Sequence, residues 1–238
     1  MTWIWANLDV IWDRTLDHLL LSVPPIILSF LIALPIGWLA RRFRLGRGFI
    51  LISVGLLYAI PSLPLFVVLP AIVGTSGRDP LNLVIALTIY GVALMVRVVA
   101  DGLASVDADV RLSATAVGFS GRVLFWQVQL PLAGPVLLAG LRVVAVSTVS
   151  LATVGAVIGV QSLGSLFTDG FQRGIEAEIV AGIVCTVLLA LAFDGALVAL
   201  GRLLMPWSRP ARPSGSPARA APGPEALDAA VLGVEAPK

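Results

Sequence analysis

The sequence predicts an all-α integral membrane protein with about five transmembrane helices, and two observations lead to that prediction. Of the 238 residues, 58% are hydrophobic and only 13% are charged, and the mean hydropathy is +0.98. A soluble domain carries about a quarter charged residues because its surface faces water, so this surface is expected to face lipid. In addition, the chain contains long apolar stretches near the length of about 20 residues that a helix needs to cross the hydrocarbon layer.

Five stretches have this length, and they are taken in chain order. They are residues 18–40, 49–74, 81–100, 132–160 and 179–204. Their lengths favour helices, since each backbone amide in lipid must be paired within the chain. The alternating segments of about ten residues that are typical of outer-membrane barrels are absent from the sequence.

The distribution of arginine and lysine predicts the orientation, because cytoplasmic loops of membrane proteins are enriched in these residues. With the N-terminus outside, eleven basic residues fall on inner segments and three on outer segments. The inner ones are Arg41, Arg42, Arg44, Arg47, Arg111, Arg122, Arg202, Arg209, Arg212, Arg219 and Lys238; the outer ones are Arg14, Arg78 and Arg173. The prediction is therefore a multi-pass membrane protein with its N-terminus outside and its C-terminus in the cytoplasm.

Three regions follow from this topology. Residues 1–17 form an outer N-terminal segment without the basic start or small-residue cleavage site of a signal peptide. Residues 18–205 form the membrane domain, which includes cytoplasmic helices over residues 105–130. Residues 206–238, rich in Pro, Ala, Gly and Arg, are expected to be a disordered cytoplasmic tail because they hold too few large apolar residues to fold.

The sequence gives no sign of catalysis, of a cofactor or of a metal site. It contains no phosphate-binding loop, no His-Glu-x-x-His, no Gly-x-Ser-x-Gly and no Cys-x-x-Cys. Cys185 is the only cysteine and is expected to be a buried, inert thiol; His18 is the only histidine and is expected to be an interfacial residue. A net charge of +2 argues against nucleic acid as a partner.

The second apolar stretch is predicted to be kinked or interrupted, because it contains Pro61, Pro64 and Pro70. Broken backbone at membrane depth is tolerated where it faces protein or a water-filled cavity. A packing kink without a role is the alternative. We favour a helix that lines a pathway through the membrane, and the candidate pathway or gate residues here are Tyr58, Pro61, Ser62 and Pro64.

The inner loop between the third and fourth stretches, residues 101–131, is too long and too patterned to be a simple connection. Ser105 or Asp107 is predicted to cap a helix that bears an apolar face of Val110, Ala114 and Val117. Glycines end that helix near Gly118, and a second short helix is expected over 122–129, ending at Pro131. The prediction is a helical hairpin on the inner face that docks on a partner.

Arg142 and Asp194 are ionisable residues inside the fourth and fifth stretches, where such residues are functional candidates. Their similar depths predict an ion pair. One hypothesis is that the pair only joins two helices; the other is that one member contacts substrate or a gate.

The hairpin resembles the coupling motif of ABC importer permeases, Glu-Ala-Ala-x-x-x-Gly-x9-Ile-x-Leu-Pro. The matching residues are Leu112-Ser113-Ala114-Thr115-Ala116-Val117-Gly118 and, after nine residues, Val128-Gln129-Leu130-Pro131. Leu112 stands where the family has its glutamate, and Ser113 where it has the first alanine. By this resemblance, Leu112, Ser113, Ala114, Gly118, Val128, Leu130 and Pro131 are the residues that couple to the ATPase.

A narrower resemblance is to the permeases for glycine betaine, carnitine and choline. It is carried by residues 58–66 (YAIPSLPLF), by Pro131-Leu132-Ala133-Gly134-Pro135 with residues 139–142 (AGLR), and by residues 155–159 (GAVIG) followed by Leu163-Gly164. The likeness covers about residues 16–205, with Val160-Gln161-Ser162 departing from the family's usual Ala-Gly-Gly run.

This resemblance implies a type I, methionine-importer-type permease of a bacterial inner membrane that imports quaternary ammonium compatible solutes by alternating access. The implied partners are an ATP-binding subunit, a separate extracytoplasmic solute-binding protein, a second permease chain of the same or a sister kind, and membrane lipid. An importer of the same architecture for another solute, such as an amino acid or sulfonate, remains an alternative. An ion-coupled secondary carrier is disfavoured by five spans without an internal repeat.

Overall fold

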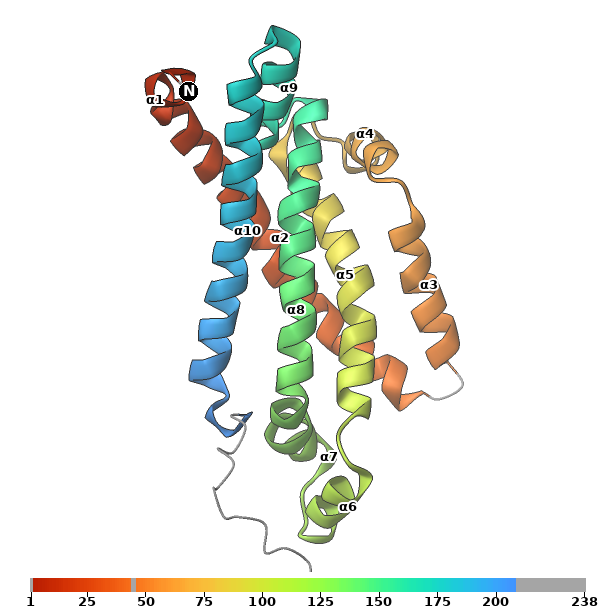
Figure 1. Cartoon of the computed structure of the whole chain (residues 1–238). Coiled ribbons are helices and arrows are strands. Elements are labelled where there is room, and N and C mark those ends of the chain that lie inside the picture. The colour runs from red at the N-terminus through yellow and green to blue at the C-terminus, as the bar shows by residue number, and fades with distance from the viewer. Residues whose placement is uncertain (1, 44–45, 209–238) are drawn as a thin grey trace, which may run out of the picture. The chain divides into compact units, whose positions relative to one another are not determined.

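The computed structural model describes residues 2–43 and 46–208, and within these ranges every regular element is a helix. The N-terminal and first membrane helices are α1 (Thr2–Ala6) and α2 (Leu8–Arg42), followed by α3 (Arg47–Ala59), α4 (Ser62–Val73) and α5 (Pro80–Ala104). A short pair, α6 (Ala108–Ala116) and α7 (Gly121–Leu124), leads through the π-helical turn η1 (Phe125–Gln129) into α8 (Leu130–Ala152). The 3-10 helix η2 (Thr153–Ile158), α9 (Gly164–Arg173) and α10 (Glu176–Leu204) complete the bundle (Figure 1).

The residues up to Pro206 form one compact unit, and a second unit runs from Trp207 to Lys238. Of the second unit only Trp207 and Ser208 are described, as the end of the 3-10 turn η3 (Pro206–Ser208). The tail predicted to be disordered otherwise lies outside the described residues.

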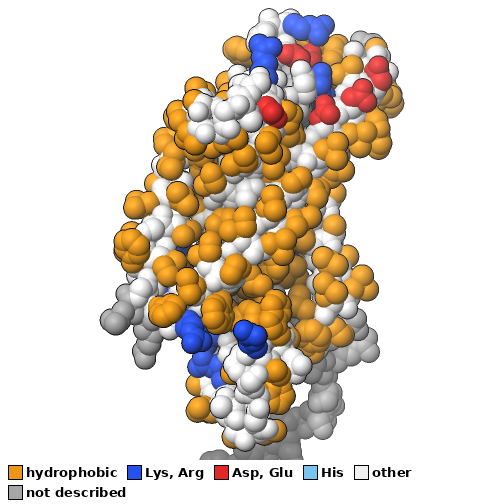
Figure 2. Space-filling model, turned by 180° about the vertical axis from the view of Figure 1, so that it is seen from behind, with side chains coloured by type: hydrophobic (Ala, Val, Ile, Leu, Met, Phe, Trp, Pro, Cys, Tyr) orange, Lys and Arg blue, Asp and Glu red, His pale blue; other side chains and the backbone are white. Residues whose placement is uncertain are grey.

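The prediction of about five spans agrees with the helices of this unit. Four helical stretches are long and apolar enough to cross a membrane, and α3 with α4 forms a fifth that is bent by 99°. Figure 2 shows hydrophobic side chains around the middle of the molecule, while carboxylates gather at the end that carries α9.

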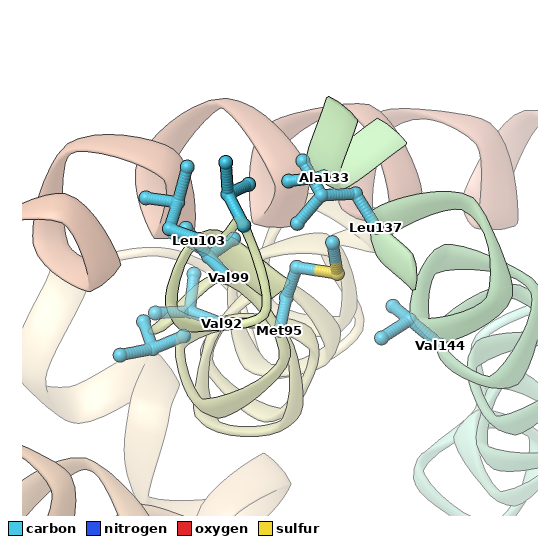
Figure 3. Close-up of a cluster of buried hydrophobic side chains, with 10 residues drawn as sticks. Val92, Met95, Val99, Leu103, Ala133, Leu137 and Val144 are labelled. Atoms are coloured by element: carbon cyan, nitrogen blue, oxygen red, sulfur yellow. The ribbon is translucent and has the colours of Figure 1, made fainter. Parts of the chain in front are cut away.

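Helix α5 lies at the centre of the bundle, and 67% of its most apolar window is buried. Its residues Val92, Met95, Val99 and Leu103 pack against α8 residues such as Leu137 (Figure 3). Glycines let these helices approach closely, as in many membrane bundles. Gly91 of α5 contacts Ser29 of α2, where an added Cβ atom would lie 2.6 Å from the Ser29 Cβ.

Two helix boundaries differ from the sequence prediction for physical reasons. Helix α2 begins at Leu8, because the residues before His18 continue the same helical hydrogen bonding even though they are more polar. The fourth span leaves α-helical geometry after Ala152 and continues as the 3-10 helix η2, which ends at left-handed Gly159 (φ 86°). Apolar composition predicted a helix as far as residue 160 but carries no information on the hydrogen-bonding pattern.

His18 is not an interfacial residue as predicted; it is completely buried. Its Nε2 atom lies 3.0 Å from the carbonyl oxygen of Val149 in α8. That carbonyl is free to accept because the amide of Thr153 turns to Ser150 and Leu151 at the start of η2. The histidine therefore provides the hydrogen bond that is lost where α8 changes geometry.

Candidate functional site

The hairpin between α5 and α8 forms as the capping residues predict. The Asp107 carboxylate accepts a hydrogen bond from the amide of Asp109 at 2.9 Å and caps α6, so Asp107 rather than Ser105 is the N-cap. Ser105 instead ends α5, and its hydroxyl donates to the carbonyl of Gly102 at 2.7 Å.

Gly118 ends α6 in the left-handed region, at φ 98°. The amide of Gly118 bonds to the carbonyl of Thr115 at 3.0 Å, and the amide of Phe119 bonds to that of Ala114 at 3.1 Å. Residues with a Cβ atom are strained at such φ values, so a glycine is the residue that turns the chain here.

The apolar face predicted for α6 is present but unoccupied by this chain, since none of the residues of α6 is buried. Val110 is 42% exposed and Val117, just after the helix, is 79% exposed, while Leu112 on the other side of the helix is 68% exposed. Ser113 is also exposed and Ala114 is half-buried. The hairpin thus presents apolar side chains to whatever lies beyond this end of the bundle.

The second part of the hairpin differs from the prediction, because it does not end at Pro131. Helix α7 passes through the π turn η1 directly into α8, and the amide of Leu130 bonds to the carbonyl of Phe125. A proline lacks an amide donor and crowds the carbonyl four residues earlier, and the wider π turn relieves that crowding. Val128, Leu130 and Pro131 are half-buried along this continuous helix.

The broken second span is confirmed. Helix α3 ends at Ala59, Ile60 and Pro61 are extended, and α4 begins at Ser62. The residue before a proline is driven out of helical geometry, which accounts for Ile60. Thirteen helical residues span only about 20 Å, so α3 alone is shorter than the hydrocarbon layer.

Tyr90 of α5 stabilises this break and was missed by the sequence analysis. In a continuous helix the Ile60 carbonyl would accept from residue 64, but Pro64 has no amide hydrogen. The Tyr90 hydroxyl donates to that carbonyl at 2.5 Å, and its ring packs edge-on against Tyr58 at a centroid distance of 5.8 Å. The missing amide of Pro64 was the signal that some side-chain donor was required.

The predicted ion pair is present. The Arg142 guanidinium on α8 meets the Asp194 carboxylate on α10 through two bonds, Nε to Oδ1 at 2.6 Å and Nη2 to Oδ2 at 2.7 Å. The side chains remain 40% and 28% exposed, respectively. The described chain therefore covers this pair only in part.

The described residues offer no metal centre: within residues 2–43 and 46–208, no three His, Cys, Asp or Glu side chains are grouped as metal ligands.

Comparison with known proteins decides the family. The model of the family described as binding-protein-dependent transport system inner membrane component matches residues 26–208. The chain belongs to this family. It is the permease subunit of an ABC importer, a membrane protein that works with an ATP-binding partner and a solute-binding protein.

Among its relatives are permeases for compatible solutes. The choline transport system permease protein OpuBB of Bacillus subtilis is 29% identical over 193 residues, which cover 81% of this chain and 88% of that protein. The carnitine transport permease protein OpuCB of Listeria monocytogenes is 30% identical over 81% of this chain and 87% of that protein. The glycine betaine/proline betaine permease ProW of Escherichia coli is 30% identical over 80% of this chain and 53% of its own length.

Solved structures confirm the predicted type of fold. An inward-facing structure of the MetNI methionine ABC transporter has a chain that matches with a TM-score of 0.72 and 21% identity, covering 86% of this permease and 98% of that chain.

Proposed function

We propose that this permease imports quaternary ammonium compatible solutes such as glycine betaine, carnitine or choline by alternating access, driven by ATP binding in a separate partner subunit. The solute assignment is supported by the relatives OpuBB, OpuCB and ProW, which are transport permeases for choline, carnitine and glycine betaine/proline betaine, respectively. The permease itself would catalyse no reaction. A solute of this kind has a diffuse charge that needs little beyond aromatic and carbonyl surfaces, and selectivity would then lie mainly in the binding protein.

We place the α6–α7 end of the bundle in the cytoplasm and the N-terminus outside. The distribution of basic residues supports this orientation, since eleven lie on the segments assigned inside and three on those outside. The carboxylates gathered at the opposite end of the molecule in Figure 2 accord with it.

Coupling to the ATPase would run through Leu112, Ser113, Ala114, Gly118, Val128, Leu130 and Pro131. The observation that supports this role is the exposed, capped α6, whose apolar residues are not buried by the described part of the chain. The turn at Gly118 and the continuous passage from α7 into α8 would let the hairpin move as a lever together with the membrane helix.

A second permease chain is proposed to pack against the face that carries Arg142 and Asp194. Charged side chains are costly where they face lipid and line bundle interiors or water-filled cavities instead. Both members of the pair remain accessible in the single chain, so the pair would face the pathway or the second chain. The binding protein would be a further, separate chain.

The function is tested in proteoliposomes that contain the permease, its ATP-binding subunit and its binding protein. Uptake of labelled glycine betaine should require internal ATP and persist when ionophores abolish ion gradients. Uptake that fails on loss of the gradient despite ATP would contradict the proposal. If the transporter took up only an amino acid or a sulfonate, the ATP-driven import mechanism would stand and the proposed solute class would be rejected.

One relative supports a different solute within the same mechanism. The ergothioneine transport permease/ergothioneine binding protein EgtU of Helicobacter pylori is 33% identical over 159 residues, which cover 67% of this chain and 28% of that protein. Competition of ergothioneine against labelled glycine betaine at the binding protein distinguishes the two.

A further inference from the structure

A basic cluster lies at the α6–α7 end of the bundle, where α2 meets the hairpin. Arg41 and Arg42 of α2, Arg111 of α6, Trp38 and Gln129 line one small cavity of about 220 Å³. The four ion pairs among the described residues involve none of these three arginines. The cavity therefore brings three positive charges together without a carboxylate, which is unfavourable unless an anion occupies it.

The hydrogen bonds at this cluster are also incomplete. Arg41 donates to the Gln129 side-chain carbonyl at 3.1 Å, and the Arg42 guanidinium lies 5.5 Å from the centre of the Trp38 ring. The Nε atom of Arg111, however, is buried and has no hydrogen-bond partner. A buried N–H without an acceptor is rare in folded proteins, and an anionic oxygen would satisfy it.

The cavity opens into a much larger groove that is almost entirely apolar. The groove holds about 1200 Å³ between α2 and the α7–η1 segment, and it shares Trp38, Arg42 and Gln129 with the basic cluster. Its apolar lining includes Leu31 and Leu39 of α2 and Phe125 and Trp126 of η1. Leu31, at the far end, is 57% exposed, and Trp126 is 59% exposed.

The length of the groove indicates what kind of ligand fits. From Arg42 to Leu31 the helix rises by roughly 16 Å, which extends from the membrane boundary into the hydrocarbon layer. A soluble ATPase cannot reach that depth, and a free phosphate would leave the apolar part unoccupied. A molecule with an anionic head and hydrocarbon chains matches both parts.

We propose that Arg41, Arg42 and Arg111 bind the phosphate of an anionic phospholipid, whose acyl chain lies in the groove between α2 and the α7–η1 segment. Basic pockets between helices at the cytoplasmic side are a recurring form of lipid recognition. The assignment to the inner leaflet rests on the orientation proposed above, whereas the binding itself does not. A lipid here contacts both the first span and the coupling hairpin.

The test is native mass spectrometry of the purified permease mixed with phosphatidylglycerol or with phosphatidylcholine of the same chains. Wild-type permease should retain phosphatidylglycerol in preference to phosphatidylcholine. The double variant Arg41→Gln/Arg42→Gln should bind it on the order of 30-fold more weakly, from the usual contribution of two arginines near a membrane surface. The matched control Arg97→Gln/Arg202→Gln removes two exposed arginines outside the groove and should bind as wild type does.

Two further variants separate the head-group site from the groove. Arg111→Gln, on the exposed α6, should weaken retention without affecting the bundle, and it keeps the test valid if the double variant does not fold. Leu31→Gln should weaken retention of the lipid while leaving every arginine in place.

Several results would overturn the proposal. These are equal retention of the two lipids by wild type, an equal loss in the control variant, and displacement of phosphatidylglycerol by millimolar inorganic phosphate. Release of the bound lipid when the complex assembles would also overturn the proposal, because it would show that a second permease or the ATP-binding subunit covers the groove. Failure of uptake with intact lipid binding would reject the proposed function and leave the lipid site standing.

Discussion

Helices α5 and α10 are both strongly apolar spans, yet the bundle buries them very differently. The most apolar window of α5 is 67% buried, whereas none of that of α10 is buried. Helix α5 contacts α2, α3, α4 and α8, while α10 packs mainly on α8 and α9. Residues such as Val187, Leu188 and Leu191 of α10 face outward.

The difference shows that the chain itself buries α5 and leaves the apolar surface of α10 exposed. The exposed side of the α8–α10 pair carries the charged bridge from Arg142 to Asp194. Side chains of this kind are not left facing lipid. We therefore expect α5 to determine stability and α10 to determine assembly and transport.

The largest expected effect is a cavity at the centre of α5. Met95 is completely buried, so Met95→Ala should lower the free energy of unfolding by about 2–5 kcal/mol. The matched truncation on α10 is Leu188→Ala, which removes a side chain that is 58% exposed. This variant should change the free energy of unfolding little. Thermal unfolding of both variants in detergent checks this, and equal losses would erase the contrast between the two helices.

A smaller effect is expected from adding a single methyl group. Gly91→Ala places a Cβ atom against Ser29 and should cost about 1–3 kcal/mol through overpacking. Gly195→Ala on α10 meets no atom within 4 Å and should stabilise slightly, by up to about 1 kcal/mol, because alanine favours helix more than glycine does. If denaturation showed that both variants lower the free energy of unfolding, α10 would be packed as tightly as α5.

The bond that holds the broken span should be weaker still. Tyr90→Phe removes the donor to the Ile60 carbonyl and should cost about 0.5–1.5 kcal/mol. Tyr58→Phe is the control, since Tyr58 contributes its ring to the contact but no hydrogen bond in the described structure. Hydrogen exchange of residues near the break should rise in the first variant only. Faster exchange in both would contradict this assignment, because it would show that losing either hydroxyl has the same effect as losing the bond to Ile60.

At α10 the expected effect is on transport rather than on the folding of the chain. Asp194→Asn keeps the shape of the side chain and removes its charge, so the bundle should fold and assemble while solute uptake is largely lost. Glu176→Gln, an exposed acid at the start of the same helix, is the control and should transport normally. Loss of assembly in Asp194→Asn would show that the pair only joins α8 to α10.

The turn at Gly118 allows a further comparison within the hairpin. Gly118→Val forces a branched side chain into a positive φ, with a strain on the order of 1–3 kcal/mol. We expect ATP hydrolysis to continue in the assembled transporter while uptake falls. Gly121→Val, close by in the same hairpin but without positive φ, should retain coupling. Normal uptake in Gly118→Val would argue strongly against a rigid lever.

The parts of the fold that local chemistry determines could be predicted from sequence. Apolar length predicted the spans, Pro61 and Pro64 predicted the break, and Gly118 predicted the end of α6. The matching depths of Arg142 and Asp194 predicted their ion pair. Each of these depends on a residue type and a spacing that the sequence displays directly.

The parts that depend on distant neighbours could not be predicted. His18 lies near a span boundary in sequence, but its burial depends on the Val149 carbonyl of a helix that comes much later. The role of Tyr90 required knowing that α5 runs beside the break. The π turn before Pro131 was missed because hydrophobic periodicity does not distinguish a helix that stops from one that widens.

We expect α6 to face the cytoplasm and to dock on the ATP-binding subunit. Cys185 is the only cysteine, so a Cys185→Ala background carrying Leu112→Cys gives one thiol on the exposed face of α6. A membrane-impermeant maleimide should label this thiol in inside-out vesicles, and a bifunctional thiol reagent should crosslink it to the ATP-binding subunit. Labelling from the outside, or no crosslink in the assembled transporter, would contradict this expectation.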